Sequence, residues 1–443
     1  MLEVIKISLA VVAGVGGVVA LVVAYRKQRL AEVGEAREHT KLYAERFDKA
    51  TDKLGSEAPS VRLAGVHALA ALADDWPGGR QMCIDVLCAY LRMPPDPEPD
   101  AEDDPSAHGT WRAMREARST ILRLIATHLR RDAATPWYGH DLDFTGVVFD
   151  NGADFREAVF SGGHVLFDGA KFSGGQVSFG DAKFSGSLVS FGDAVFSGSL
   201  VSFGGAVFSG GQVGFSSAVF SGGSALFVDA VFCGGSVWFV DAVFSGSEVA
   251  FDDAKFSGGE VSFNRAELSS GEVSFTNAVF SSGQVPFFSA VFSGGQIGFN
   301  GAEFSNCWVP FDDAKFSGGK VTFDDARFSG LVVFRDAKFS GGEIAFTNAV
   351  FSGGQVSFER ADFSGGKISF CGALFSGGMV WFQDAAFSGG EVDFADAADW
   401  SSPPTCLPDQ APGLRLPPQP VLQVNSQPVD DDSESEGDAV GLP

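Results

Sequence analysis

Repeated carboxylates and glycines are the residues whose spacing suggests chemistry. Asp181, Asp193, Asp229, Asp241 and Asp253 are separated by multiples of twelve residues, and such a carboxylate series is compatible with calcium. Ser-Gly-Gly triplets recur between them, and glycine-rich backbone can cradle phosphate. However, the Asp residues lack the multi-ligand spacing of a calcium loop, and the triplets recur along the whole pattern. We therefore interpret the Asp residues as turn formers and the triplets as corners.

The other chemistry-bearing residues form no recognisable site in the sequence. His67, His108 and His128 are isolated, and no serine-hydrolase, zinc-protease, P-loop or dinucleotide-binding motif is present. The cysteines form no C-x-x-C pair and fit a reducing compartment; they are Cys83, Cys88, Cys233, Cys307, Cys371 and Cys406. We therefore expect no catalytic residue, no metal ligand and no cofactor, and a protein that is not an enzyme.

Composition points to repetition instead. The chain of 443 residues contains 44 Phe and 56 Gly, and its net charge is −25. The negative charge is concentrated after residue 140, and a field of this sign repels phosphates. The composition therefore argues against direct binding to nucleic acid.

The repeat has a unit of twelve residues. All phenylalanines except Phe47 lie between Phe144 and Phe394, and their spacings alternate between seven and five residues. One unit reads Phe172-Ser-Gly-Gly-Gln-Val177-Ser-Phe179-Gly-Asp-Ala182-Lys-Phe184. Residues two apart share one face of a strand, so each unit predicts two short strands that bury Val-x-Phe and Ala-x-Phe. A mainly β solenoid over residues 141–396 is the expected fold.

Charge pairing favours one of two windings of this solenoid. A coil of 12 residues would stack Glu248, Glu260 and Glu272 on one another, which is unfavourable. A coil of 24 residues separates Glu260 from the other two and places Asp241 beside Arg265. It also places Arg360 between Asp336 and Asp384, after correction for a shortened unit near Phe328. We therefore favour 24 residues, and 12 remains the alternative.

Two short segments resemble a known family. Ala153-Asp154-Phe155 and Ala266-Glu267-Leu268 resemble the A(D/N)LXX unit of pentapeptide-repeat proteins, and the five-residue Phe spacing matches it. The resemblance implies a right-handed quadrilateral β-helix and no particular activity. The seven-residue step through Ser-Gly-Gly departs from the strict pattern. The whole layout resembles a group of uncharacterised bacterial membrane-anchored pentapeptide-repeat proteins with FSGG-type units.

The amino terminus predicts a membrane anchor. Residues 7–25 contain no charge and are rich in Val, Ala and Leu, which suits a transmembrane helix over residues 4–25. Arg26, Lys27 and Arg29 follow it, so we expect a single-pass protein of the cell membrane whose C-terminal bulk is cytoplasmic. A cleaved signal peptide is disfavoured, because the charged flank is not a cleavage site.

The flanks of the repeat have their own character. We expect a charged helix at residues 26–58 and a small helical domain at 59–135, with helices near 80–92 and 111–131. An acidic, Pro-rich linker covers residues 94–105. Residues 397–443 are Pro-rich and acidic, which predicts a disordered tail.

Outward positions of the repeat are where a partner would bind. Trp238 and Trp381 occupy outward slots, and the outward valines are Val195, Val207, Val219, Val231 and Val243. With 24-residue coils, Val195, Val219 and Val243 share one face. We therefore expect a membrane-tethered, non-enzymatic scaffold that binds an unidentified protein through Trp238, Trp381 or these three valines, which also allow a homodimer. The alternative is a DNA-mimicking inhibitor or protector of a topoisomerase, an activity found among soluble family members.

Overall fold

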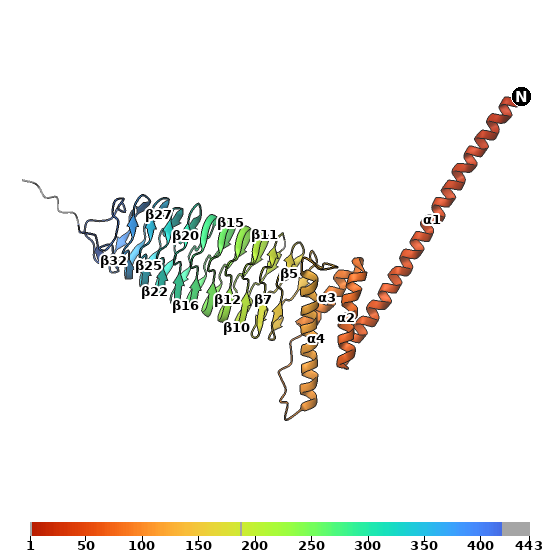
Figure 1. The fold of residues 1–443 in the computed structure, drawn as a ribbon, viewed down its shortest axis with the longest axis horizontal. Coiled ribbons are helices and arrows are strands. Elements are labelled where there is room, and N and C mark those ends of the chain that lie inside the picture. The colour runs from red at the N-terminus through yellow and green to blue at the C-terminus, as the bar shows by residue number, and fades with distance from the viewer. Residues whose placement is uncertain (1, 187, 419–443) are drawn as a thin grey trace, which may run out of the picture.

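A computed structural model describes residues 2–186 and 188–418; the side chains of residues 2–19 and 30–37 are outside this description. Four α-helices precede a long β-solenoid (Figure 1). They are α1 (Leu2–Leu54), α2 (Pro59–Asp75), α3 (Arg80–Arg92) and α4 (Pro105–Leu129), with a 3₁₀ turn at Pro77–Gly79. The expected charged helix is the second part of α1, which runs without interruption from Leu2.

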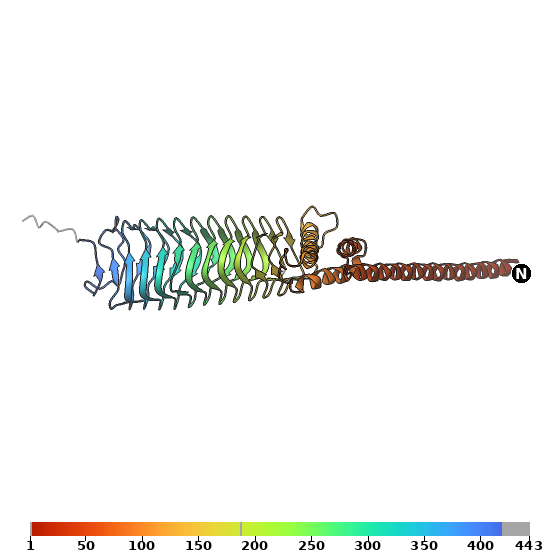
Figure 2. The same ribbon diagram turned by 90° about the horizontal axis from the view of Figure 1, so that it is seen from below.

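The solenoid has about 11 turns and two parallel sheets along its length (Figure 2). Sheet 1 contains β1 (Leu142–Asp143), β4 (Val159–Phe160), β5 (His164–Leu166), β8 (Lys183–Phe184), β9 (Leu188–Ser190), β11 (Val207–Gly214), β13 (Val231–Trp238), β15 (Lys255–Ser262), β17 (Val279–Gln284), β20 (Glu303–Phe304), β21 (Trp308–Pro310), β23 (Arg327–Phe328), β24 (Leu331–Val333), β26 (Val350–Phe351), β27 (Gln355–Ser357), β29 (Leu374–Phe375) and β30 (Met379–Trp381). Sheet 2 contains β2 (Val148–Phe149), β3 (Ala153–Asp154), β6 (Lys171–Phe172), β7 (Gln176–Ser178), β10 (Val195–Ser202), β12 (Val219–Leu226), β14 (Val243–Ala250), β16 (Glu267–Ser274), β18 (Val291–Phe292), β19 (Gln296–Gly298), β22 (Lys315–Thr322), β25 (Lys338–Ala345), β28 (Asp362–Ser369), β31 (Ala386–Phe387), β32 (Glu391–Asp393) and β33 (Leu414–Arg415).

The register confirms the 24-residue coil. Val195 lies beside Val219, and Val219 lies beside Val243, so neighbouring strands of one sheet are separated by 24 residues. Across the shortened unit the step is 23, because Trp308 lies beside Leu331, and after it the step returns to 24, with Leu331 beside Gln355. The missing residue is absorbed at a glycine bend and the inward positions keep their phase.

Each coil bends at two kinds of corner. The first is a four-residue turn such as Phe227–Ala230, in which the Ala230 N–H donates to the Phe227 carbonyl at 3.1 Å. Its third residue, Asp229, has φ of 57°, a conformation that Asp adopts more readily than most residues. The second corner is the glycine bend inside each long strand. At Gly223 (φ 72°) an added Cβ would lie 2.3 Å from the Ser199 carbonyl oxygen, so close contact between coils requires glycine there.

Phenylalanine ladders fill the interior, as the spacing predicts. Phe251 is fully buried and stacks on Phe227 and Phe275 with ring centroids 4.7 and 4.8 Å apart. It also meets Phe239 edge-on at 5.7 Å and 87°. Such contacts contribute roughly 0.5–1.5 kcal/mol each beyond the burial of area. One ladder is interrupted, because Leu268 lies between Phe244 and Phe292.

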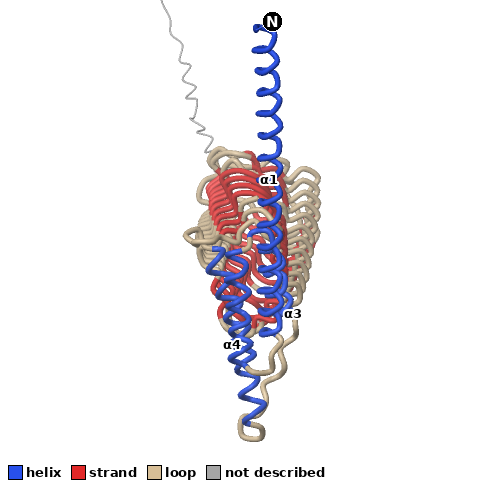
Figure 3. Tube along the Cα trace, turned by 90° about the vertical axis from the view of Figure 1, so that its right-hand side faces the viewer, coloured by secondary structure: helices blue, strands red, loops and turns tan. Residues whose placement is uncertain are grey.

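The helical domain packs on the first coils of the solenoid (Figure 3). Trp137 is fully buried, stacks on His128 at 4.1 Å and donates its indole N–H to Asp74 at 2.9 Å. Arg92 of α3 reaches the carboxylate of Asp143 in β1 at 2.7 Å. The domain therefore covers one end of the Phe core.

The helices differ from expectation at one boundary. α4 begins at Pro105 rather than near 111, because the Asp104 side chain accepts the Ala107 N–H at 2.8 Å and so caps the helix. The linker from residue 94 correspondingly ends where α4 starts.

Among the residues whose side chains the structure describes, no helix is long and apolar enough to cross a membrane. The expected span at 4–25 lies largely outside those residues.

The expected start of the tail at residue 397 is wrong. Leu414–Arg415 forms β33 beside β32, and Thr405 bridges to Trp381. Trp400 and Leu407 pack against the core. Residues 397–416 therefore cover the last coil, because the exposed Phe ladder has to be shielded there; residues 419–443 lie outside the described residues.

Candidate interaction surfaces

The tryptophans of the described solenoid strands lie on one arm of sheet 1. In each long strand we call the part after the glycine bend the trailing arm, for example Ser236–Trp238 of β13. The short strands that continue this column, such as β21 and β30, have the same name. Trp238, Trp308 and Trp381 all lie on the trailing arms of sheet 1, and each is partly exposed. Their strands follow one another at intervals of three coils, or about 14 Å. We call this surface the aromatic face.

The aromatic face extends beyond the two tryptophans that the sequence analysis selected. Trp308 contacts Phe288 with ring centroids 5.7 Å apart, and Leu331 lies beside Trp308 in the next coil. Met379, beside Trp381, is 56% exposed. The sequence signal for this group was Phe288, the one phenylalanine of the repeat region outside the regular spacing.

The trailing arms of sheet 2 carry several charges, whereas Glu260 is the charged residue of this position on sheet 1. Glu248 and Glu272 are neighbours, in agreement with the 24-residue register. Farther along, Lys320, Glu343 and Lys367 alternate in sign from coil to coil, and Glu391 follows Lys367. We call this surface the charged face.

The outward valines form two short columns. Val195, Val219 and Val243 are neighbours on sheet 2, and Val207 and Val231 are neighbours on sheet 1, as the 24-residue coil predicts. Lys171 and Glu267 lie at the two ends of the three-valine column and limit its length. Trp238 lies in the same strand as Val231, beyond the glycine bend, and so shares a sheet with it.

The turns that join the two sheets form two edges. One edge holds the expected pairs: Arg265 makes two hydrogen bonds of 2.7 Å to Asp241, and Arg360 makes two of 2.8 and 2.6 Å to Asp336. The hydrogen bonds from Arg265 hold the pKa of Asp241 below its usual value. The other edge, which we call the acidic edge, carries Glu157, Asp181, Asp229, Asp253 and Asp325.

Groups with catalytic or metal-binding potential stay apart within the described residues. There, no group of three or more His, Cys, Asp and Glu side chains is placed to hold a metal ion. Each corner Asp is the single positive-φ residue of its own turn, in keeping with the turn interpretation. Burial raises the pKa of Cys83 to about 11 and those of Cys88 and Cys307 to about 12, so these thiols are poor nucleophiles at neutral pH.

Comparison with known proteins does not assign the chain to a family. No family model, no curated protein and no solved structure matches the chain. The regular Phe spacing and the solenoid of about 11 turns are in keeping with a pentapeptide-repeat fold. The two faces of the rod are therefore the features of the molecule that bear on its function.

Proposed function

We propose that the protein is a non-enzymatic scaffold that binds a protein partner through the aromatic face. The observation that carries this proposal is the concentration of Trp238, Trp308 and Trp381 on one arm of one sheet, opposite a charged arm. Tryptophan is one of the residues enriched among the few that contribute most of the binding energy of protein interfaces. A solenoid suits this role because its coils hold such side chains at fixed intervals.

The scaffold is tethered to the cell membrane by residues 4–25 in this proposal, with the rod in the cytoplasm. In the described part of that segment, Leu21 and Val23 are 73% and 59% exposed, which supports a need for an apolar cover. Arg26, Lys27 and Arg29 hold the following side in the cytoplasm. A reporter that is active only in the cytoplasm should be active when it is fused after Pro443. Activity of a reporter that works only in the periplasm would refute this topology.

Proximity labelling of the full chain in its native cell tests the scaffold role. A proximity-labelling enzyme fused to the wild-type chain should label a specific set of membrane-associated proteins. When Trp238, Trp308 and Trp381 are changed together to Ser, the labelling of this set should be lost. In a matched variant, Glu248, Glu272 and Lys320 on the charged face are changed to Ser. This variant should still label the same set of proteins. Equal labelling by all three chains would refute the aromatic face as the binding surface.

A DNA-mimicking inhibitor or protector of a topoisomerase is the second candidate. The acidic edge favours it, because its carboxylates repeat at coil spacing, about 4.8 Å or multiples of it. Added full chain should then inhibit DNA supercoiling by a topoisomerase, or protect that enzyme from a poison. Asp229 and Asp253 changed to Asn should abolish the effect. If micromolar concentrations of the full chain change neither DNA supercoiling by the topoisomerase nor its sensitivity to the poison, this candidate is excluded. The scaffold proposal would then remain intact.

A further inference from the structure

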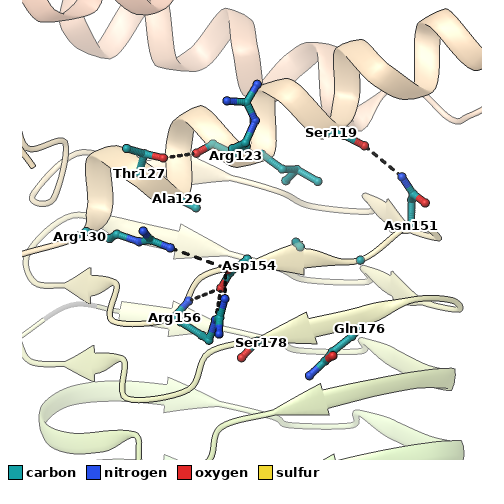
Figure 4. Close-up of a pocket in the computed structure, with 13 residues that line it drawn as sticks. Ser119, Arg123, Ala126, Thr127, Arg130, Asn151, Asp154, Arg156, Gln176 and Ser178 are labelled. Carbon is teal, nitrogen blue, oxygen red and sulfur yellow. Dashed lines mark hydrogen bonds and ion pairs between the residues drawn. The ribbon is translucent and has the colours of Figure 1, made fainter.

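A cleft of about 780 Å³ lies between α4 and the first coils of the solenoid (Figure 4). One wall is α4, with Leu122, Ala126 and Thr127. The floor is β3 and the start of β7, with Ala153 and Gln176. Its size falls within the range of about 300–1,000 Å³ that is usual for small-molecule sites.

Positive charge exceeds negative charge among the residues that line this cleft. Arg123, Arg130 and Arg156 line it together with a single carboxylate, Asp154. Glu157 follows Arg156 in the sequence, interacts with it electrostatically and offsets part of this charge. The excess is unusual in a chain whose net charge is −25.

Asp154 is already engaged by one of the three arginines. Arg156 donates to the Asp154 carboxylate from Nε at 2.9 Å and from a terminal nitrogen at 2.8 Å, so this side of its guanidinium makes a bidentate pair with Asp154. These hydrogen bonds hold the pKa of Asp154 below its usual value, and the carboxylate stays ionised at neutral pH. Asp154 therefore pairs closely with Arg156, and its ion pair with Arg130 is the longer of the two.

Arg130 makes a long ion pair with Asp154, and the hydrogen-bond donors of its guanidinium remain available to a ligand. Its nearest carboxylate oxygen, on Asp154, is 3.6 Å away, and within the described residues its side chain makes no hydrogen bond. Its Nε is buried and without a partner, and Figure 4 shows the side chain directed toward Asp154 across the cleft. A buried donor without a partner is costly, and a charged donor more so.

Arg123 adds a second guanidinium on the α4 wall. It is exposed, and no ion pair or hydrogen bond of its guanidinium occurs in the described part of the chain. In Figure 4 the side chain points away from Asp154 and lies at the rim. Being long and exposed, it can rotate toward an anion held by Arg130.

We propose that this cleft binds a small molecule that carries a phosphate or carboxylate group. The oxyanion lies against the guanidinium of Arg130 with Arg123 closing over it, since planar guanidinium forks match both anions. The remainder of the ligand packs on Leu122, Ala126 and Ala153. A long polyanion is disfavoured, because the adjoining acidic edge begins at Glu157 and Asp181.

The ligand would join α4 to the solenoid, and this proposal is independent of the scaffold role. A ligand that binds only the folded protein raises its stability in proportion to the logarithm of its concentration. Isothermal titration and thermal unfolding of the full chain therefore give two readouts. The probes are pyrophosphate and AMP for phosphate, citrate for carboxylate, and adenosine as the uncharged control.

We expect at least one anionic probe to bind and adenosine to fail. Arg130→Gln and Arg123→Gln should each weaken that binding by at least about tenfold, and Arg130→Lys by less, because it keeps the charge. The matched control is Arg335→Gln, an exposed arginine on the edge opposite the acidic edge, which should bind like wild type. Thr127→Trp, at an exposed position of the wall, should block binding without a change of charge.

Three results would overturn the proposal: no anionic probe binds at millimolar concentration, Arg335→Gln loses as much affinity as Arg130→Gln, or Thr127→Trp binds normally. Because Arg123 has no partner whose loss would unfold the chain, Arg123→Gln keeps the test valid if Arg130→Gln fails to fold. Pyrophosphate binding without citrate binding would assign phosphate chemistry, and the reverse would assign carboxylate chemistry; both support the site.

Discussion

The aromatic face and the charged face are built from the same twelve-residue unit, yet one presents tryptophans and the other presents mainly charged side chains. Both trailing arms follow a glycine bend, and both bury the same central residue, such as Val237 in β13 and Val249 in β14. They differ only at the outward positions that flank it, where Trp238 stands on one face and Glu248 on the other. Repetition therefore fixes the backbone and leaves the outward positions free.

The difference follows from what each position contacts. Inward Phe, Val and Ala touch the coils above and below, so a change there is felt in several ladders. Outward side chains touch at most their neighbours in the column. Selection for binding can consequently act on one face without disturbing the other.

The largest effect should come from a change that destroys both faces together. Phe251→Asp places a charge among Phe227, Phe239 and Phe275, and we expect it to cost at least about 4 kcal/mol. Circular dichroism of the full chain should show loss of the β signal or a much lower melting temperature. An unchanged melting temperature would contradict the inward assignment.

A smaller effect is expected from a substitution that stabilises the core beneath sheet 2 alone. Leu268→Phe completes the ladder between Phe244 and Phe292, and two new ring contacts should stabilise the chain by about 1 kcal/mol. Thermal unfolding measures this change. A lower melting temperature would mean that the site is too small for a ring.

The edge between the sheets supplies a test with pH. Because Arg265 lowers the pKa of Asp241, this carboxylate contributes stability above its unfolded pKa, near the usual value of 3.8, and loses it as the pH falls through the lower, folded pKa. In Arg265→Gln the pKa of Asp241 should return toward 3.8. NMR titration of the Asp carboxyl carbons would detect this rise; an unmoved resonance would show that the pair is absent in solution.

The smallest expected effect is on self-association. Val195, Val219 and Val243 changed together to Thr should leave the sedimentation coefficient of the full chain unchanged, because charged residues limit this column to three valines. Trp238→Ser serves as the comparison. Dissociation of an oligomer by the valine variant alone would move the interface to sheet 2.

Sequence reasoning predicted what the repeat period controls and missed what it does not. The Phe core, the 24-residue register and the Asp241–Arg265 pair follow from residues one coil apart. The docking of α3 and α4, the packing of residues 397–416 and the cleft beside Arg130 depend on contacts between segments outside that period. Trp308 was missed because its outward slot looked like any other until its neighbour Phe288 was placed in space.

A matched pair of glutamines tests the central claim most directly. Gln284 on sheet 1 and Gln296 on sheet 2 occupy the same position of the repeat, both are exposed, and Gln284 lies beside Trp308. A photoreactive residue placed at each position of the full chain, and activated in the native cell, reports which face contacts protein. We predict a discrete crosslinked species from position 284 that Trp308→Ser removes, and none from position 296. Crosslinks of equal yield at both positions, or only at 296, would contradict the account.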